Sequence, residues 1–111
     1  MILFNPQFVA AYAGRCRNFY FLERYLEAID DCSLGISIDN DLVDLYIHRG
    51  NAQDSLGNHN AAIADYSLAI SLEGDRSDAF YNRALAYNYL QDYQQALANY
   101  NRSIDLNPQE S

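Results

Sequence analysis

The sequence predicts an all-α protein built from three repeated helical hairpins. The first observation is a repeat: residues 46–72 align with residues 80–106 without a gap, a shift of 34 positions, and the same shift backwards aligns a further copy. The second is periodicity, because apolar residues in each copy recur three and four positions apart over two stretches of about 13 residues. This spacing is typical of helices and not of strands.

Length and composition limit the classes of function. The 111 residues are enough for one small core. No apolar run reaches the roughly 18 residues of a membrane span, and the start MILFNPQF lacks the pattern of a secretion signal. Seven arginines, no lysine and fifteen acidic residues give a net charge of -8, which would repel a phosphate backbone. We therefore expect a cytoplasmic protein with neither a membrane nor a nucleic acid as its partner.

The register of the repeat predicts the boundaries of units and helices. The expected units are residues 9–42, 43–76 and 77–110, with residues 1–8 as the end of a preceding repeat. Helices are expected at about 9–21, 25–38, 43–55, 59–72, 77–89 and 93–106. Gly57 supplies a glycine signal for the end of a helix, and Pro6 and Pro108 are expected to follow helix ends.

Small residues recur at the places where two helices should approach most closely. They are Cys16, Gly50 and Ala84 on the first helices, and Ala28, Ala62 and Ala96 on the second helices. A larger side chain at these places would push the helices apart and leave voids. Aromatic residues fill the space between them, so they are interpreted as core and not as a cofactor site.

The pattern of small and aromatic residues is most complete in the third unit. It comprises Phe80, Ala84, Tyr87, Ala96, Tyr100, Ser103 and Pro108. A helical pair of this length with this pattern resembles the tetratricopeptide repeat (TPR) family. The second unit departs from it at Gln53 and Gly74, and the first has Cys32 where an aromatic residue is usual. The resemblance covers residues 9–110. It implies a right-handed α-α superhelix, or solenoid, that acts as a scaffold for protein-protein interaction.

Arginine occupies the seventh place of all three units, where the family commonly has leucine. Burying a guanidinium without a partner would cost several kcal/mol. The predicted partners lie sixteen residues later; the pairs are Arg15 with Asp31, Arg49 with Asp65, and Arg83 with Asn99. A functional arginine ladder is the alternative interpretation.

Cys16 and Cys32 are the two cysteines of the sequence, at positions that should face each other in the first hairpin. Without a secretion signal we expect two buried thiols, and a disulfide is the alternative. No catalytic motif or phosphate-binding loop is present, and His48 and His59 lack a third ligand at useful spacing. We therefore expect no enzyme activity, no cofactor and no metal.

The resemblance implies that the first helix of each unit lines a concave face that contacts the partner. The expected contact residues are Arg17, Tyr20, Phe21, Asp44, Ile47, His48, Asn51, Asp54, Asp78, Tyr81, Asn82, Leu85, Asn88 and Tyr89. This lining is aromatic, rich in amides and mildly acidic, so it favours a neutral or basic peptide or helix. A subclass that grips the C-terminal carboxylate of heat-shock chaperones needs cations at places that hold Ala13, Arg17, His48, Asp78 and Asn82 here. Only Arg17 carries a fixed positive charge, so this activity is not expected.

The last predicted helix has no polar helix after it to cover its apolar face. Leu97, Ile104 and Leu106 are therefore expected to face water and to form an interface. The chain is expected either to be part of a longer array or to associate end to end through residues 93–106. A structural segment that stacks in this way, without a peptide ligand, is the alternative to the scaffold function.

Overall fold

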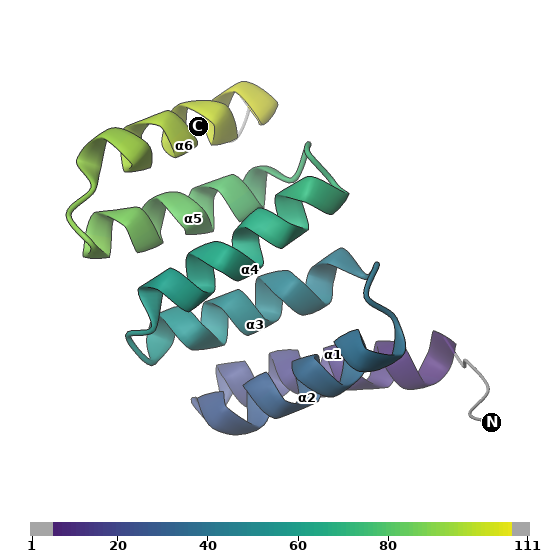
Figure 1. The fold of residues 1–111 in the computed structure, drawn as a ribbon. Helices are drawn as coiled ribbons and strands as arrows, with labels where there is room; N and C mark the ends of the chain where they lie inside the picture. Colours follow the sequence, from purple (N-terminus) through teal and green to yellow (C-terminus); the bar gives the residue numbers. More distant parts are fainter. Residues whose placement is uncertain (1–5, 108–111) are drawn as a thin grey trace.

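The computed structural model describes residues 6–107, which form six α-helices in three consecutive antiparallel hairpins (Figure 1). The helices are α1 (Pro6–Phe21), α2 (Tyr25–Ile38), α3 (Val43–Ser55), α4 (His59–Leu72), α5 (Ser77–Tyr89) and α6 (Tyr93–Leu106). No described residue lies in a strand. The bounds of α2 to α6 are those predicted from the sequence. None of the described helices is long and apolar enough to cross a membrane.

The start of α1 differs from the prediction. The helix begins at Pro6, whereas the sequence predicted a start at residue 9 and a helix end before Pro6. Proline fits the first turn of a helix because its missing N–H would have no partner there and its fixed φ angle suits the helix. Residues 6–8 therefore belong to the first hairpin, while residues 1–5 and Pro108 lie outside the described part of the chain.

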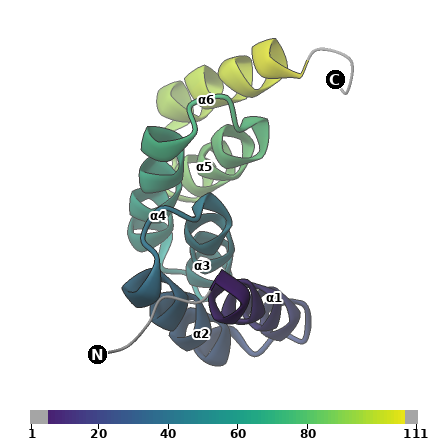
Figure 2. The ribbon, with the colours of Figure 1, turned by 90° about the vertical axis from the view of Figure 1, so that its right-hand side faces the viewer.

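The six helices form two layers that follow one curve. α1, α3 and α5 lie on the inner side of the curve, and α2, α4 and α6 lie on the outer side (Figure 2). The inner helix α3 packs against α1, α2, α4 and α5, whereas α6 contacts only α5 among the described helices. Each hairpin thus packs on its neighbours, and the inner side is built by the first helices, as the family resemblance implied.

The small residues lie where the helices of a hairpin are closest, as predicted. Ala28, Ala62 and Ala84 are fully buried. Gly50 shows the reason most clearly, because a Cβ atom at this residue would lie 2.6 Å from Cε1 of Tyr66. Any larger residue would displace the Tyr66 ring, which is itself buried and donates a hydrogen bond from its hydroxyl to Oδ1 of Asn51 at 2.7 Å.

The prediction of two free thiols is wrong, because Cys16 and Cys32 form a disulfide between α1 and α2. Their Cα atoms are 5.5 Å apart, within the range that a disulfide requires, and both residues are fully buried. In the second hairpin the same two positions hold Gly50 and Tyr66. The disulfide therefore occupies the place of a contact between a small residue and an aromatic ring.

The predicted pairs between arginines and second-helix residues are confirmed. Nε and Nη2 of Arg49 donate to the two carboxylate oxygens of Asp65 at 3.0 and 2.7 Å. Arg15 binds Asp31 with the same bidentate geometry. In the third hairpin, Nε of Arg83 donates to Oδ1 of Asn99 at 2.7 Å. Each arginine thus ties the two helices of its own hairpin.

The sequence did not predict a further bond from the second and third arginines to the preceding hairpin. Nη1 of Arg49 donates to Oγ of Ser33 at 3.2 Å, and Nη1 of Arg83 donates to Oγ of Ser67 at 3.1 Å. These arginines therefore link consecutive hairpins as well as the two helices within one hairpin.

Candidate functional site

The structure sorts the fourteen residues expected on the concave face into three groups. Six are exposed: Arg17, Phe21, Asp44, Asp78, Tyr81 and Tyr89. Seven are half-buried: Tyr20, His48, Asn51, Asp54, Asn82, Leu85 and Asn88. Ile47 is only 3% exposed and cannot present its side chain to a ligand. We call the inner surface of α1, α3 and α5 the concave groove.

Ile47 is a correction to the sequence prediction, and its burial has a clear cause. It packs in a cluster with Val43, Tyr46, Ala69 and Ala79. Ala79, at the start of α5, belongs to the next hairpin and is fully buried against this cluster. Ile47 then fills the interface between the two hairpins instead of facing the groove.

One end of the concave groove holds a shallow cavity between α1 and α3, with a volume of about 290 Å³. Ala10, Ala13 and Gly14 are among its small lining residues, and Arg17 and His48 add a guanidinium and an imidazole. Nothing lies within 4 Å of the place where a Cβ of Gly14 would be, so this wall is open. Within residues 6–107, Arg17 forms no ion pair and its charge faces the cavity.

His48 is half-buried in this cavity, and burial lowers its pKa below the ordinary value. Asp44 and Asp78 oppose this shift, while the positive charges of Arg17 and Arg76 add to it. At neutral pH the imidazole is therefore uncharged and can both donate and accept a hydrogen bond.

Arg76 lies just before α5 and joins the inner helices of the second and third hairpins. Its Nη2 donates to Oδ1 of Asp44 on α3 at 3.0 Å and to Oδ2 of Asp78 on α5 at 2.9 Å. These hydrogen bonds raise the pKa of Arg76. Two of the acidic groups expected to contact a partner are therefore partly neutralised by one guanidinium. Arg76 was not among the predicted contact residues, because it lies between helices and not at an inner position of a first helix.

Three polar residues expected to contact a partner are engaged inside the fold. Oδ1 of Asn51 accepts the hydroxyl of Tyr66, and Nδ2 of Asn88 donates to the hydroxyl of Tyr100 at 3.0 Å. Asp54 pairs with Nδ1 of His59 at 2.5 Å. The polar atoms of Asn51, Asp54 and Asn88 therefore hold neighbouring side chains in place.

The other end of the concave groove is aromatic. The ring of Tyr89 stacks on His59 with centroids 4.7 Å apart, and Tyr81 meets Tyr100 edge to face at 5.9 Å. Tyr81 and Tyr89 nevertheless stay exposed. These rings offer flat apolar surface with a hydroxyl group at the rim, a combination that is common in surfaces that bind peptides.

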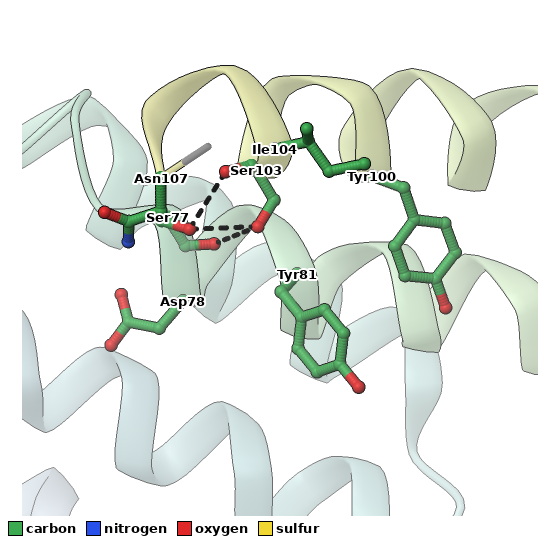
Figure 3. Close-up of a pocket in the computed structure, with 7 residues that line it drawn as sticks. All are labelled: Ser77, Asp78, Tyr81, Tyr100, Ser103, Ile104 and Asn107. Atoms are coloured by element: carbon green, nitrogen blue, oxygen red, sulfur yellow. Dashed lines mark hydrogen bonds between the residues drawn. The ribbon is translucent and has the colours of Figure 1, made fainter. Parts of the chain in front are cut away.

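A second hollow lies at the end of the stack, between α5 and α6, with a volume of about 600 Å³. Its lining residues are Ser77, Asp78, Tyr81, Tyr100, Ser103, Ile104 and Asn107 (Figure 3). Oγ of Ser77 donates to the carbonyl of Ser103 at 3.1 Å and holds α5 against α6. Leu97 and Ile104 are exposed on α6, as expected, whereas Leu106 is half-buried.

Stacked helical hairpins around a concave groove define a helical-repeat scaffold for protein-protein interaction. Sequence models of the tetratricopeptide repeat match residues 43–76 and 77–110. The chain therefore belongs to the tetratricopeptide repeat family, whose members are typically scaffolds without enzyme activity. A comparison with curated protein sequences finds no match.

Several solved structures share the fold. The first TPR of Spaghetti (RPAP3), bound to the HSP90 peptide SRMEEVD, is 26% identical with a TM-score of 0.91, over 97% of this chain and 86% of that one. The first TPR domain of human RPAP3 is also 26% identical with a TM-score of 0.91, over 94% and 82%. The Sgt2 TPR domain from Aspergillus fumigatus is 24% identical with a TM-score of 0.86, over 92% and 67%, and shows the fold alone.

Proposed function

We propose that this chain binds a peptide or helix of a partner protein in its concave groove. The observation that carries the proposal is the set of inner-face side chains that the core does not use. Arg17 and His48 line the cavity at one end, and Tyr81 and Tyr89 are exposed at the other. The peptide complex of the first Spaghetti TPR, at 26% identity, supports a peptide as the class of ligand.

We propose further that the bound segment is neutral or basic. The places that would hold cations for an acidic C-terminal peptide carry Ala13, an uncharged His48 and Asp78. Among the described residues Arg17 is the one groove cation without an ion pair, because Arg76 is already bound to Asp44 and Asp78. An acidic ligand would therefore meet little free positive charge. The net charge of -8 acts in the same direction by steering cationic segments towards the protein.

Peptide display on the immobilised chain tests both parts of this proposal. Sequencing of the selected peptides is expected to show neutral and basic segments. Asn82→Ala and Tyr89→Ala are expected to weaken binding of the selected peptides, because both side chains border the concave groove, while the fold stays intact by circular dichroism. Asp30→Ala is the matched control, because Asp30 is exposed on α2, in the outer layer.

The peptide SRMEEVD is the direct probe of charge preference. Fluorescence anisotropy is expected to show weak binding to the unchanged chain and stronger binding to the double variant Ala13→Lys/Asp78→Lys, which adds two cations to the groove. Tight binding of SRMEEVD to the unchanged chain would refute the charge preference. Selected peptides that bind Asn82→Ala and Tyr89→Ala at full strength would refute the concave groove as the site.

We propose self-association through α6 as a second property. Leu97 is 61% exposed and Ile104 is 48% exposed, on the helix that contacts only α5 among the described helices. Apolar surface of this kind commonly marks an interface.

A further inference from the structure

Within residues 6–107, the last hairpin leaves open a surface that is covered in the preceding hairpin. Tyr81 is 48% exposed, whereas Ile47, at the same place one repeat earlier, is buried against α5. Tyr100 and Ser103 are half-buried, whereas their counterparts Tyr66 and Ala69 are buried. We call the surface formed by Tyr81, Leu97, Tyr100, Ser103 and Ile104 the end face. In the two preceding hairpins, the first helix of the next hairpin packs on the second helix at this position.

The helices that cover this surface inside the chain share a simple pattern. α5 presents Ala79 and Ala86, seven residues apart and fully buried, with Arg83 between them. α3 presents Leu45 and Ala52 at the same places, also fully buried, with Arg49 between them. In both helices Nη1 of the arginine donates to a serine of the preceding hairpin.

The corresponding face of α1, here called the α1 face, repeats part of this pattern and has no neighbouring helix among the described residues. Ala11 is exposed at the place of Leu45 and Ala79. The Arg15 side chain is 59% exposed, and within the described residues its Nη1 has no acceptor, unlike Nη1 of Arg49. Phe8, which is 63% exposed, lies beside them and lines a hollow of about 210 Å³ together with Ala11 and Arg15.

The end hairpin carries the matching acceptor. The serines that receive a bond from Arg49 and Arg83 are Ser33 and Ser67, 34 residues apart, and the next place in this series is Asn101. Asn101 is exposed on α6, and its amide oxygen can accept the same bond. Nη1 of Arg15, at one end of the stack, thus corresponds to the amide oxygen of Asn101 at the other end.

We infer that α1 of a second copy docks on the end face in the way that α3 and α5 dock within the chain, with Nη1 of Arg15 donating to Oδ1 of Asn101. The inference rests on the self-association proposed above and gives it a geometry. The contact joins unlike surfaces, so each dimer keeps one free α1 face and one free end face, to which further copies can add.

Asn18 allows a specific test of this head-to-tail geometry. It stands at the place of Ala52 and Ala86, which are fully buried in the contacts within the chain, and it is exposed on α1. A polar and larger side chain at this place weakens the contact between copies. Asn18→Ala is therefore expected to lower the concentration needed for association by about fivefold. A contact between two α6 helices would not respond to this change.

Two variants that each block one face test the inference by sedimentation velocity over a concentration series. Ala11→Arg blocks the α1 face, and Leu97→Glu blocks the end face. Each variant alone is expected to stay monomeric. An equimolar mixture is expected to form a 1:1 dimer, because one variant keeps an intact α1 face and the other an intact end face. The control is Ala98→Glu, which adds the same charge at a place that is exposed in all three hairpins and should associate like the unchanged chain.

The outcomes separate this inference from the proposal on which it rests. If the unchanged chain remains monomeric at every concentration, both are wrong. If Leu97→Glu abolishes association but Ala11→Arg does not, and the mixture forms no heterodimer, then α6 is an interface but the head-to-tail geometry is wrong. All of the substituted residues are exposed, so thermal melts should show each variant folded like the unchanged chain.

Discussion

At the scale of single residues, the size of the side chain at a few places sets the distance between helices. Gly50 is the clearest case, because Tyr66 lies where its Cβ would be. The alanines at the equivalent close contacts on the second helices act in the same way. These places tolerate little additional volume, because the surrounding interior is already densely packed.

We predict that Ala62→Leu and Ala96→Leu each lower the free energy of unfolding by about 1 to 3 kcal/mol through overpacking. Both residues are buried where two helices meet. Ala10→Leu should be nearly neutral, because Ala10 is exposed on α1. Urea unfolding of the three variants measures the difference. If Ala10→Leu were the most damaging change, the assignment of helix faces would be wrong.

At the scale of helices, the sequence predicted nearly everything that depends on periodicity. The bounds of α2 to α6 follow from the apolar spacing, and the partner of Arg49 follows from the 34-residue register. The start of α1 was missed because Pro6 is equally compatible with the end and the start of a helix. Glu23 and Gln91 adopt left-handed backbone with φ of 62°, at the place where Gly57 gave the expected signal, so hairpin turns form here without glycine.

The features that the sequence did not predict depend on contacts between particular side chains. The burial of Ile47 depends on its packing against Ala69 of α4 and Ala79 of α5. The role of Arg76 depends on two carboxylates that the fold brings together from α3 and α5. The positions of Cys16 and Cys32 already placed the two residues face to face, but the absence of a secretion signal favoured free thiols over the disulfide that forms.

The disulfide gives a prediction about the first hairpin. Replacing both cysteines by alanine removes the covalent link and leaves space that no aromatic ring fills, so the free energy of unfolding should fall by about 3 kcal/mol. The variant Cys16→Gly/Cys32→Tyr recreates the pair seen at Gly50 and Tyr66 and should regain part of this loss. Urea unfolding with and without a dithiol reductant provides the measurement. Equal stability of the oxidised and reduced protein would contradict the prediction.

At the scale of the whole molecule, stability should vary along the stack. α3 packs against four other helices, whereas α6 packs only against α5 among the described helices. In repeat proteins each unit is stabilised mainly by its immediate neighbours, so the end opens more easily than the middle.

We therefore predict that backbone amides exchange with solvent fastest in α6 and slowest in α3. Hydrogen exchange followed by mass spectrometry tests this, and the Leu97→Glu variant keeps association from covering α6. In the oxidised protein α1 and α2 should exchange more slowly than α5 and α6, because the disulfide holds the first hairpin together. Uniform exchange over all six helices would instead indicate that the chain unfolds as a single unit.

The tie made by Arg76 has a mechanical consequence. It spans the inner side of the curve, where α3 and α5 face each other, and the molecule measures 47 × 26 × 22 Å. Tension applied along the long axis would straighten the curve and draw the inner helices apart, so the contact between Arg76 and Asp44 would carry load early. The protein would then behave as a short spring whose inner side yields first, and a segment bound across α3 and α5 would stiffen it.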